Sequence, residues 1–104
     1  MKSRRLFYKP ADSFFARLLK DPETKLYYEE EHVKTSIAMA VKAVRFRAKL
    51  TQAQLAKKIG TTQSVIARLE GGGDRRIPSL SLLARIATAC HGELEFGFKF
   101  KKAA

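Results

Sequence analysis

The sequence lacks the features that would place it in several classes of protein. Its single cysteine, Cys90, excludes an internal disulfide and fits a reducing cytoplasm. The longest uninterrupted apolar run is Ile37 to Val41, which is far too short to span a membrane. The N-terminus MKSRRLFYKP is charged and has no apolar stretch behind it, so we expect no secretory signal. These absences predict a cytoplasmic protein with no membrane partner.

Residues that often signal catalysis or metal binding lack the neighbours they would need. Glu29 and His32 are three apart on an expected helix, but nothing supplies a third metal ligand. Cys90 and His91 are adjacent and point to different faces, so we interpret Cys90 as a small core residue. The glycines at 71–73 follow a helix, whereas a phosphate-binding loop joins a strand to a helix. We expect no enzymatic activity, no metal and no cofactor.

Acidic residues are scarce, above all in the middle of the chain. The sequence has 21 Lys and Arg against 10 Asp and Glu, for a net charge of +11. Residues 35–76 hold 9 basic and 2 acidic residues (net +7), whereas residues 1–34 and 77–104 are each only +2. This balance favours nucleic acid or another anionic surface as a partner. The alternative is a basic surface that only keeps the protein soluble.

Hydrophobic spacing predicts a mostly α-helical chain. Apolar residues share one face of a helix over residues 10–20: Phe14, Phe15, Leu18 and Leu19. Asp21-Pro22-Glu23 has the pattern of a new helix start, and that helix runs into the acidic residues 29–31. Thr35 or Ser36 is expected to cap a further helix. Its inward residues follow helical spacing: Ile37, Val41, Val44 and Ala48.

Two short helices hinged at a glycine come next. Thr51 caps a helix over residues 52–59, Gly60 ends it, and Thr61 or Thr62 caps a second helix over residues 63–70. Ala56 is small where the two helices approach most closely. The expected inward residues form one consistent set: Leu55, Ile59, Val65, Ile66 and Leu69. This is the sequence pattern of a helix-turn-helix.

The second helix of this unit leaves polar side chains outward: Thr62, Gln63, Ser64 and Arg68. Gln63 can bond an adenine edge through two hydrogen bonds, and Arg68 can bond guanine or a phosphate. Gln52, at the start of the first helix, is placed for a phosphate oxygen. The alternative interpretation is a simple helical hairpin with a solvated face.

The last third changes period. Pro78-Ser79 opens a helix that ends near Gly92. Its expected inward residues are Leu80, Leu83, Ile86 and Ala87. Apolar and polar residues then alternate, with the apolar set being Leu94, Phe96, Phe98 and Phe100. A period of two with aromatics predicts a strand.

The stretch TQAQLAKKIGTTQSVIARLEGG resembles the helix-turn-helix of the Xre family, which includes the Cro and phage-repressor proteins. The resemblance lies in five short segments: Thr51-Gln52, Leu55-Ala56, Gly60, residues 61–64 and residues 69–71. It implies a five-helix fold with the helix near Thr62 in the major groove and Gln52 on the DNA backbone. It also implies that the base-reading residues are Gln63, Ser64 and Arg68.

Two departures from the family pattern affect the loop after this unit. The family often has Asn or Ser where Gly71 stands, and the loop to Pro78 is slightly longer here. The family's phosphate contact from this loop therefore does not carry over directly, and Arg75 and Arg76 are the loop residues expected to supply one here.

A second resemblance covers most of the chain. The Leu-Lys-Asp-Pro-Glu stretch at residues 19–23, a tyrosine at 27 or 28, Pro78-Ser79-Leu80 and a short C-terminal strand are similar to the HigA group of antitoxins. That resemblance implies a RelE/HigB-like ribonuclease toxin as a protein partner. It also implies repression of the shared promoter by a homodimer bound to double-stranded operator DNA.

The acidic cluster of the sequence lies beside two tyrosines and offers a surface for a basic partner. The expected partner-binding residues are Tyr27, Tyr28, Glu29, Glu30 and Glu31. Aromatic anchors beside complementary charge are typical of such surfaces. The alternative is a solvated helical face with the tyrosines packed on the core.

The C-terminal alternation suggests a dimer. If two copies pair antiparallel about Gly97, Glu95 faces Lys99 of the other chain and Phe96 faces Phe98, with Leu94 opposite Phe100. A two-fold interface requires this self-complementarity. The competing pairing is with residues 6–8 of the same chain.

Together these patterns divide the chain into an N-terminal helical extension (1–34), a DNA-binding domain (35–92) and a C-terminal strand with a basic tail (93–104). The expected function is sequence-specific transcriptional repression by an antitoxin that regulates its own operon. A stand-alone Xre-type regulator is the main alternative. An interaction protein whose helix-turn-helix has lost DNA affinity is a third possibility.

Overall fold

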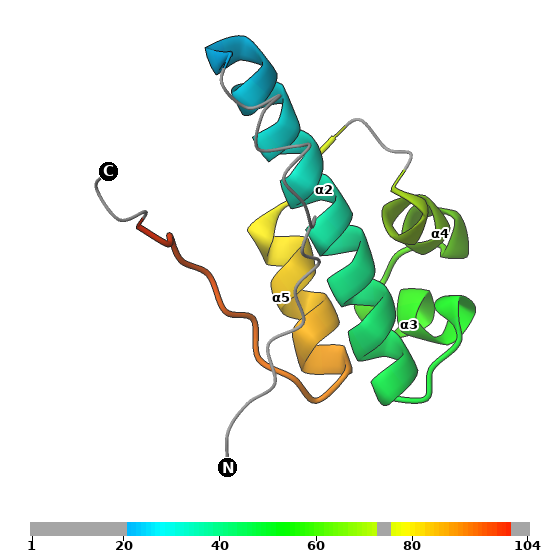
Figure 1. The fold of residues 1–104 in the computed structure, drawn as a ribbon. Coiled ribbons are helices and arrows are strands. Elements are labelled where there is room, and N and C mark those ends of the chain that lie inside the picture. Colours follow the sequence, from blue (N-terminus) through cyan, green and yellow to red (C-terminus); the bar gives the residue numbers. More distant parts are fainter. Residues whose placement is uncertain (1–20, 73–75, 101–104) are drawn as a thin grey trace.

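The computed structural model describes residues 21–72 and 76–100, and within them the protein is mostly helical (Figure 1). The elements are α2 (Pro22–Arg47), α3 (Gln52–Ile59), α4 (Gln63–Gly71) and α5 (Leu80–Ala89). In Figure 1, α5 lies along one side of α2, with α3 and α4 on its other side. The helix expected over residues 10–20 lies outside the described residues.

Helix α2 is longer than the spacing predicted. Asp21 is its N-cap and accepts a hydrogen bond from the Thr24 backbone N–H at 2.9 Å, as expected for Asp21-Pro22-Glu23. The cap predicted at Thr35 or Ser36 is wrong, because the helix continues through both residues to Arg47. Hydroxyl residues favour caps but do not break a helix, and no Gly or Pro interrupts residues 23–47. The predicted junction at residues 34 and 35 therefore falls inside α2.

The helix-turn-helix pattern is confirmed. Thr51 and Gln54 form a reciprocal capping box at the start of α3, with hydrogen bonds of 3.0 and 2.8 Å. Gly60 ends α3 in the left-handed conformation at φ 76°, which a glycine adopts without steric cost. Thr62 caps α4, so the two helices are separated by a turn of only three residues, 60–62.

The core lies where α2, α3, α4 and α5 meet, and it follows most of the predicted inward positions. Val65 and Ala87, also predicted to face inward, are only half-buried and lie outside this cluster. Leu55, Ile66 and Ile86 are completely or almost completely buried, and the buried Cys90 joins the same cluster. Leu80, however, was expected to face inward and is 55% exposed. It is the first residue of α5, and Leu83 one turn later already lies in the core.

The five-helix domain and the C-terminal strand are not supported. Residues 21–72 and 76–100 contain four helices and no strand. Residues 92–100 leave the end of α5 without regular structure, and residues 91–100 are all exposed. A strand exists only when a neighbouring strand accepts and donates its backbone hydrogen bonds, and none of the described segments does so here. The competing pairing with residues 6–8 lies outside the described residues.

Candidate nucleic-acid interface

Helix α4 has an apolar inner face and a polar outer face. Ile66 is fully buried, and Leu69 packs against the core. The outward residues are all exposed: Thr62, Gln63, Ser64, Ala67 and Arg68. The Thr62 hydroxyl accepts a 3.4 Å hydrogen bond from the Val65 N–H, which is the role of an N-cap. The helix therefore presents short polar groups and one guanidinium to solvent, and its N-terminus also attracts anions.

The start of α3 is tied to the end of α4 through a side chain. The Gln52 Nε2 donates a hydrogen bond to Glu70 Oε1 at 3.2 Å. Gln52 is partly buried and stands at the first position of α3, where backbone N–H groups have no partner within the helix. The Gln52 side chain, which is predicted to contact a phosphate, is thus already hydrogen-bonded to Glu70.

Glu70 is held in turn by a buried arginine. Arg45 of α2 donates from Nε to Glu70 Oε2 at 2.6 Å and from Nη2 to Glu70 Oε1 at 2.8 Å. The side chains are only 8% and 3% exposed. The third donor, Arg45 Nη1, bonds the Leu50 carbonyl at 2.8 Å. This fork therefore joins α2, the segment before α3 and the end of α4.

The ion pair controls the acid–base state of Glu70. Burial by itself would raise the pKa of Glu70, but hydrogen bonds from Arg45 and Gln52, with the charges of Arg45 and Lys42, lower it below its ordinary value. Donating these hydrogen bonds to the Glu70 carboxylate raises the pKa of Arg45. Both groups therefore stay charged at neutral pH, and their charges cancel.

This pairing leaves the outside of the unit without acidic residues. Glu70 is the only Asp or Glu between residues 32 and 72. Six cationic residues in that span are exposed: Lys42, Arg47, Lys49, Lys57, Lys58 and Arg68. An excess of exposed charge of one sign attracts a polyanion, and one of these six residues, Arg68, stands on the exposed face of α4.

The sequence patterns did not reveal the Arg45–Glu70 pair. A signal was present, because Arg45 follows Ile37 and Val41 at helical spacing and so lies on the apolar stripe of α2. A charged residue on such a stripe is rarely buried unless it is paired. Its partner is 25 residues away, however, and no local spacing identifies it.

The remaining predicted residues fall into two groups. Arg76 is exposed beside the loop, while Arg75 lies outside the described residues.

The predicted partner-binding residues 27–31 do not form one face, since five consecutive residues wrap around a helix. Tyr27 is 66% exposed, and Leu26 beside it is 62% exposed. Glu30 is exposed and lies one turn from both of them.

Two of the predicted partner-binding residues, Tyr28 and Glu31, interact with other side chains of α2. The Tyr28 ring lies parallel to the His32 ring, with centroids 6.5 Å apart. Lys34 Nζ donates to Glu31 Oε1 at 3.2 Å. Tyr28 and Glu31 are both half-buried. The exposed residues of the predicted surface are therefore Tyr27, Glu29 and Glu30. Tyr27 and Glu30 share one face of the helix with the exposed Leu26, which the prediction did not include, and we call Leu26, Tyr27 and Glu30 the α2 patch.

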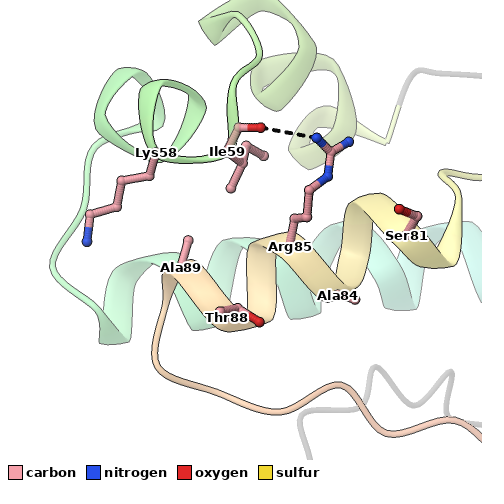
Figure 2. A pocket seen from close by; sticks show the side chains of 7 residues that line it. All are labelled: Lys58, Ile59, Ser81, Ala84, Arg85, Thr88 and Ala89. Carbon is pink, nitrogen blue, oxygen red and sulfur yellow. Dashed lines mark hydrogen bonds between the residues drawn. The ribbon is translucent and has the colours of Figure 1, made fainter.

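A shallow hollow of about 540 Å³ lies between α3 and α5 (Figure 2). Arg85 Nη1 donates to the Ile59 carbonyl at 3.2 Å, which satisfies an acceptor at the end of α3. The residues that line the hollow are Lys58, Ile59, Ser81, Ala84, Arg85, Thr88 and Ala89. Among the described residues, no three His, Cys, Asp or Glu side chains are grouped to hold a metal.

The fold and the interface define a helix-turn-helix protein. Residues 41–96 match the model of the helix-turn-helix family HTH_3, which is of the Xre type. The match covers more than half of the chain, and the chain belongs to this family. The domain is that of a DNA-binding transcriptional regulator.

Two further findings bound the description. No solved structure matches the chain significantly. Among the helices formed by residues 21–72 and 76–100, none is long and apolar enough to cross a membrane. The family match begins inside α2, so the α2 patch lies outside it.

Proposed function

We propose that the protein is a sequence-specific repressor that reads double-stranded operator DNA with α4. The observation that carries this proposal is the exposed polar face of α4 within a unit whose only carboxylate is buried and neutralised. Gln63 and Ser64 stand in the first turn of α4, where a helix entering the major groove meets base edges. Arg68 follows one turn later. Gln52 and Arg76, with Arg75, are assigned to the DNA backbone.

Two alanine variants test the base-reading assignment. Gln63→Ala and Arg68→Ala each weaken binding to the upstream DNA of the protein's own gene by about 1–3 kcal/mol. Binding to an unrelated duplex changes less, because base contacts carry the specificity. Lys58→Ala is the control, since it removes one exposed charge of the same unit from the hollow between α3 and α5. Unchanged affinity in both α4 variants would reject the assignment.

We propose that a second copy pairs with the C-terminal segment. Phe96 and Phe98 pack edge to face with centroids 5.6 Å apart, and both remain largely exposed. An exposed run of Leu94, Phe96, Phe98 and Phe100 is a large apolar surface for so small a protein. Antiparallel pairing about Gly97 would supply the hydrogen bonds that a strand needs. It would also produce the two-fold symmetry typical of operator-binding dimers.

A charge exchange tests this pairing better than deletion alone. Removing residues 93–104 shifts sedimentation towards the monomer. Glu95→Lys places like charges opposite Lys99 of the other chain and weakens the dimer. Adding Lys99→Glu restores the opposite charges and therefore the dimer. A deletion variant that sediments as the wild type, or a double variant without recovery, contradicts the pairing.

We also propose that the protein is the antitoxin of a toxin–antitoxin pair, as its similarity to HigA proteins suggests. The α2 patch supports this role because it combines two exposed apolar side chains with a carboxylate suited to a basic toxin. The expected partner is a RelE/HigB-like ribonuclease encoded beside this gene. Without such a neighbour, the protein is a stand-alone regulator and the antitoxin role fails.

Substitutions in the α2 patch separate the two activities. Tyr27→Ala and Glu30→Lys abolish or strongly weaken capture of the toxin while operator binding is retained. Lys25→Glu is the control, because it reverses an exposed charge of the same helix on a face away from Leu26, Tyr27 and Glu30. Changing Glu29, Glu30 and Glu31 together to lysine tests the whole acidic cluster. A triple variant that still neutralises the toxin removes this surface from consideration.

A further inference from the structure

We propose that Glu70 is a positioning residue for DNA binding, which orients the Gln52 amide toward a phosphate of the DNA backbone. The inference rests on the proposed DNA-binding function and on the assignment of Gln52 to the backbone. It adds a residue that does not itself touch DNA. It also gives the buried Arg45–Glu70 pair a role beyond stability.

The hydrogen-bonding chemistry fixes which way the Gln52 amide faces. An ionised carboxylate can only accept, so the group that meets Glu70 Oε1 at 3.2 Å must be the Gln52 NH₂. A primary amide has two N–H donors in one plane at a fixed angle. Once one N–H is bonded to Glu70, the direction of the other is set, and we assign that second donor to the phosphate oxygen.

The anchor itself is rigid. Glu70 accepts two hydrogen bonds from the planar Arg45 fork, at 2.6 and 2.8 Å, and its side chain is 3% exposed. The remaining Arg45 donor holds the carbonyl of Leu50, two residues before Gln52. One guanidinium therefore holds the backbone leading into α3 directly, and it holds the side-chain amide of Gln52, the first residue of α3, through Glu70. Such preorganisation reduces the ordering cost of binding.

The charge arrangement explains how an acidic residue is tolerated near a polyanion. Glu70 is the single carboxylate between residues 32 and 72, and an unpaired one would repel DNA phosphates. Arg45 is hydrogen-bonded to Glu70 and cancels the negative charge of its carboxylate. The carboxylate therefore supplies an acceptor for Gln52 without changing the net charge of the surface.

The test is a cycle of four proteins: wild type, Gln52→Ala, the double variant Arg45→Met/Glu70→Met, and the combined triple variant. The double variant replaces the buried pair with apolar side chains, an exchange that proteins often tolerate, and leaves the net charge unchanged. Operator affinity is measured against salt concentration, after circular dichroism has verified that each variant is folded.

Gln52→Ala is expected to weaken operator binding about tenfold, the effect of losing one hydrogen bond to a charged group. Because Gln52 carries no charge, the salt slope stays unchanged. The double variant shows a similar loss, and the triple variant is no weaker than either. A purely structural role for Glu70 predicts instead that the double variant binds like wild type, or that the two losses add. Either result overturns the proposal.

Mobility of the Gln52 side chain gives a second readout that needs no variant. If Glu70 orients the amide, the Gln52 NH₂ has a high NMR order parameter in the free protein, well above that of the exposed Gln63 NH₂. Equal mobility of the two groups overturns the proposal. Full binding by Gln52→Ala would also overturn it but leave base reading by α4 intact, whereas wild-type protein that binds no operator refutes the proposed function itself.

Discussion

The two halves of α2 share one uninterrupted helix but have different surroundings. Its C-terminal half contributes Ala38, Val41 and Arg45 to the buried part of the molecule, whereas no residue of 22–37 is fully buried. The family match starts at residue 41 and so includes only the last part of this helix. Local sequence is sufficient to form the helix, whereas packing against α3, α4 and α5 determines which part of it is buried in the core.

Each half also carries a carboxylate interaction of a different kind. Asp21 caps the N-terminus of α2 in full solvent exposure, and hydrogen bonds from the Thr24 backbone and side chain lower its pKa. Near the other end, Arg45 binds Glu70 in a buried pair. An exposed interaction competes with water, whereas a buried charge cannot be left without a partner. The consequences of removing each should therefore differ widely.

The largest effect is expected at the buried end. Arg45→Ala leaves the Glu70 carboxylate buried without its counter-charge and lowers the free energy of unfolding by about 3–5 kcal/mol. Urea denaturation followed by circular dichroism measures the loss. The variant Arg45→Met/Glu70→Met is the control, because it removes both charges and should remain close to wild type. A small loss in Arg45→Ala would mean that water reaches Glu70.

Matched apolar truncations compare the two halves directly. Val41→Ala removes methyl groups from the core and costs about 2 kcal/mol of unfolding free energy, since Val41 is 4% exposed. Leu26→Ala removes more carbon from the same helix yet stays within about 0.5 kcal/mol of wild type. The same urea measurement decides. Comparable losses at the two positions would show that Leu26 is covered in solution.

Acid should weaken the buried end selectively. The folded-state pKa of Glu70 lies below its ordinary value of 4.5, so the ionised carboxylate stabilises the fold. That stabilisation is fully present above about pH 4.5 and is lost as the pH falls through the folded-state pKa. Urea midpoints between pH 7 and pH 3 should fall more steeply for wild type than for Arg45→Met/Glu70→Met. Parallel pH profiles would contradict this assignment.

The smallest effect is expected at the exposed end. Asp21→Ala removes the hydrogen bond to the Thr24 N–H, so the first turn of α2 frays. Helicity measured by circular dichroism decreases slightly, while the global unfolding midpoint is unchanged. Asp21→Asn keeps a capping acceptor and is the control. A clear drop in the midpoint would show that the first turn is coupled to the core.

Several features were predictable because they depend on neighbours in sequence. The caps at Asp21, Thr51 and Thr62 and the left-handed Gly60 each follow from hydrogen bonds or steric limits within four residues. Helical spacing also identified the buried Leu55 and Ile66. The outward residues of α4 follow from that same spacing, and their contacts with DNA remain a proposal.

The failures share the opposite property. The length of α2 could not be inferred from Thr35 and Ser36, whose hydroxyls suit either a cap or a helix interior. The C-terminal alternation describes which side chains would share a face, but a strand also needs a partner that the chain does not name. Tyr27 and Tyr28 are neighbours in sequence and point to different sides of one helix.

The helix-turn-helix could be predicted from the amino-acid sequence alone, because capping, turn geometry and apolar spacing act over a few residues. The meeting of Arg45, Glu70 and Gln52 depends instead on how the helices pack, since these residues come from three helices and are joined by no local pattern. The physical reason is that an ion pair depends on distance in space, which folding sets only after the helices have packed.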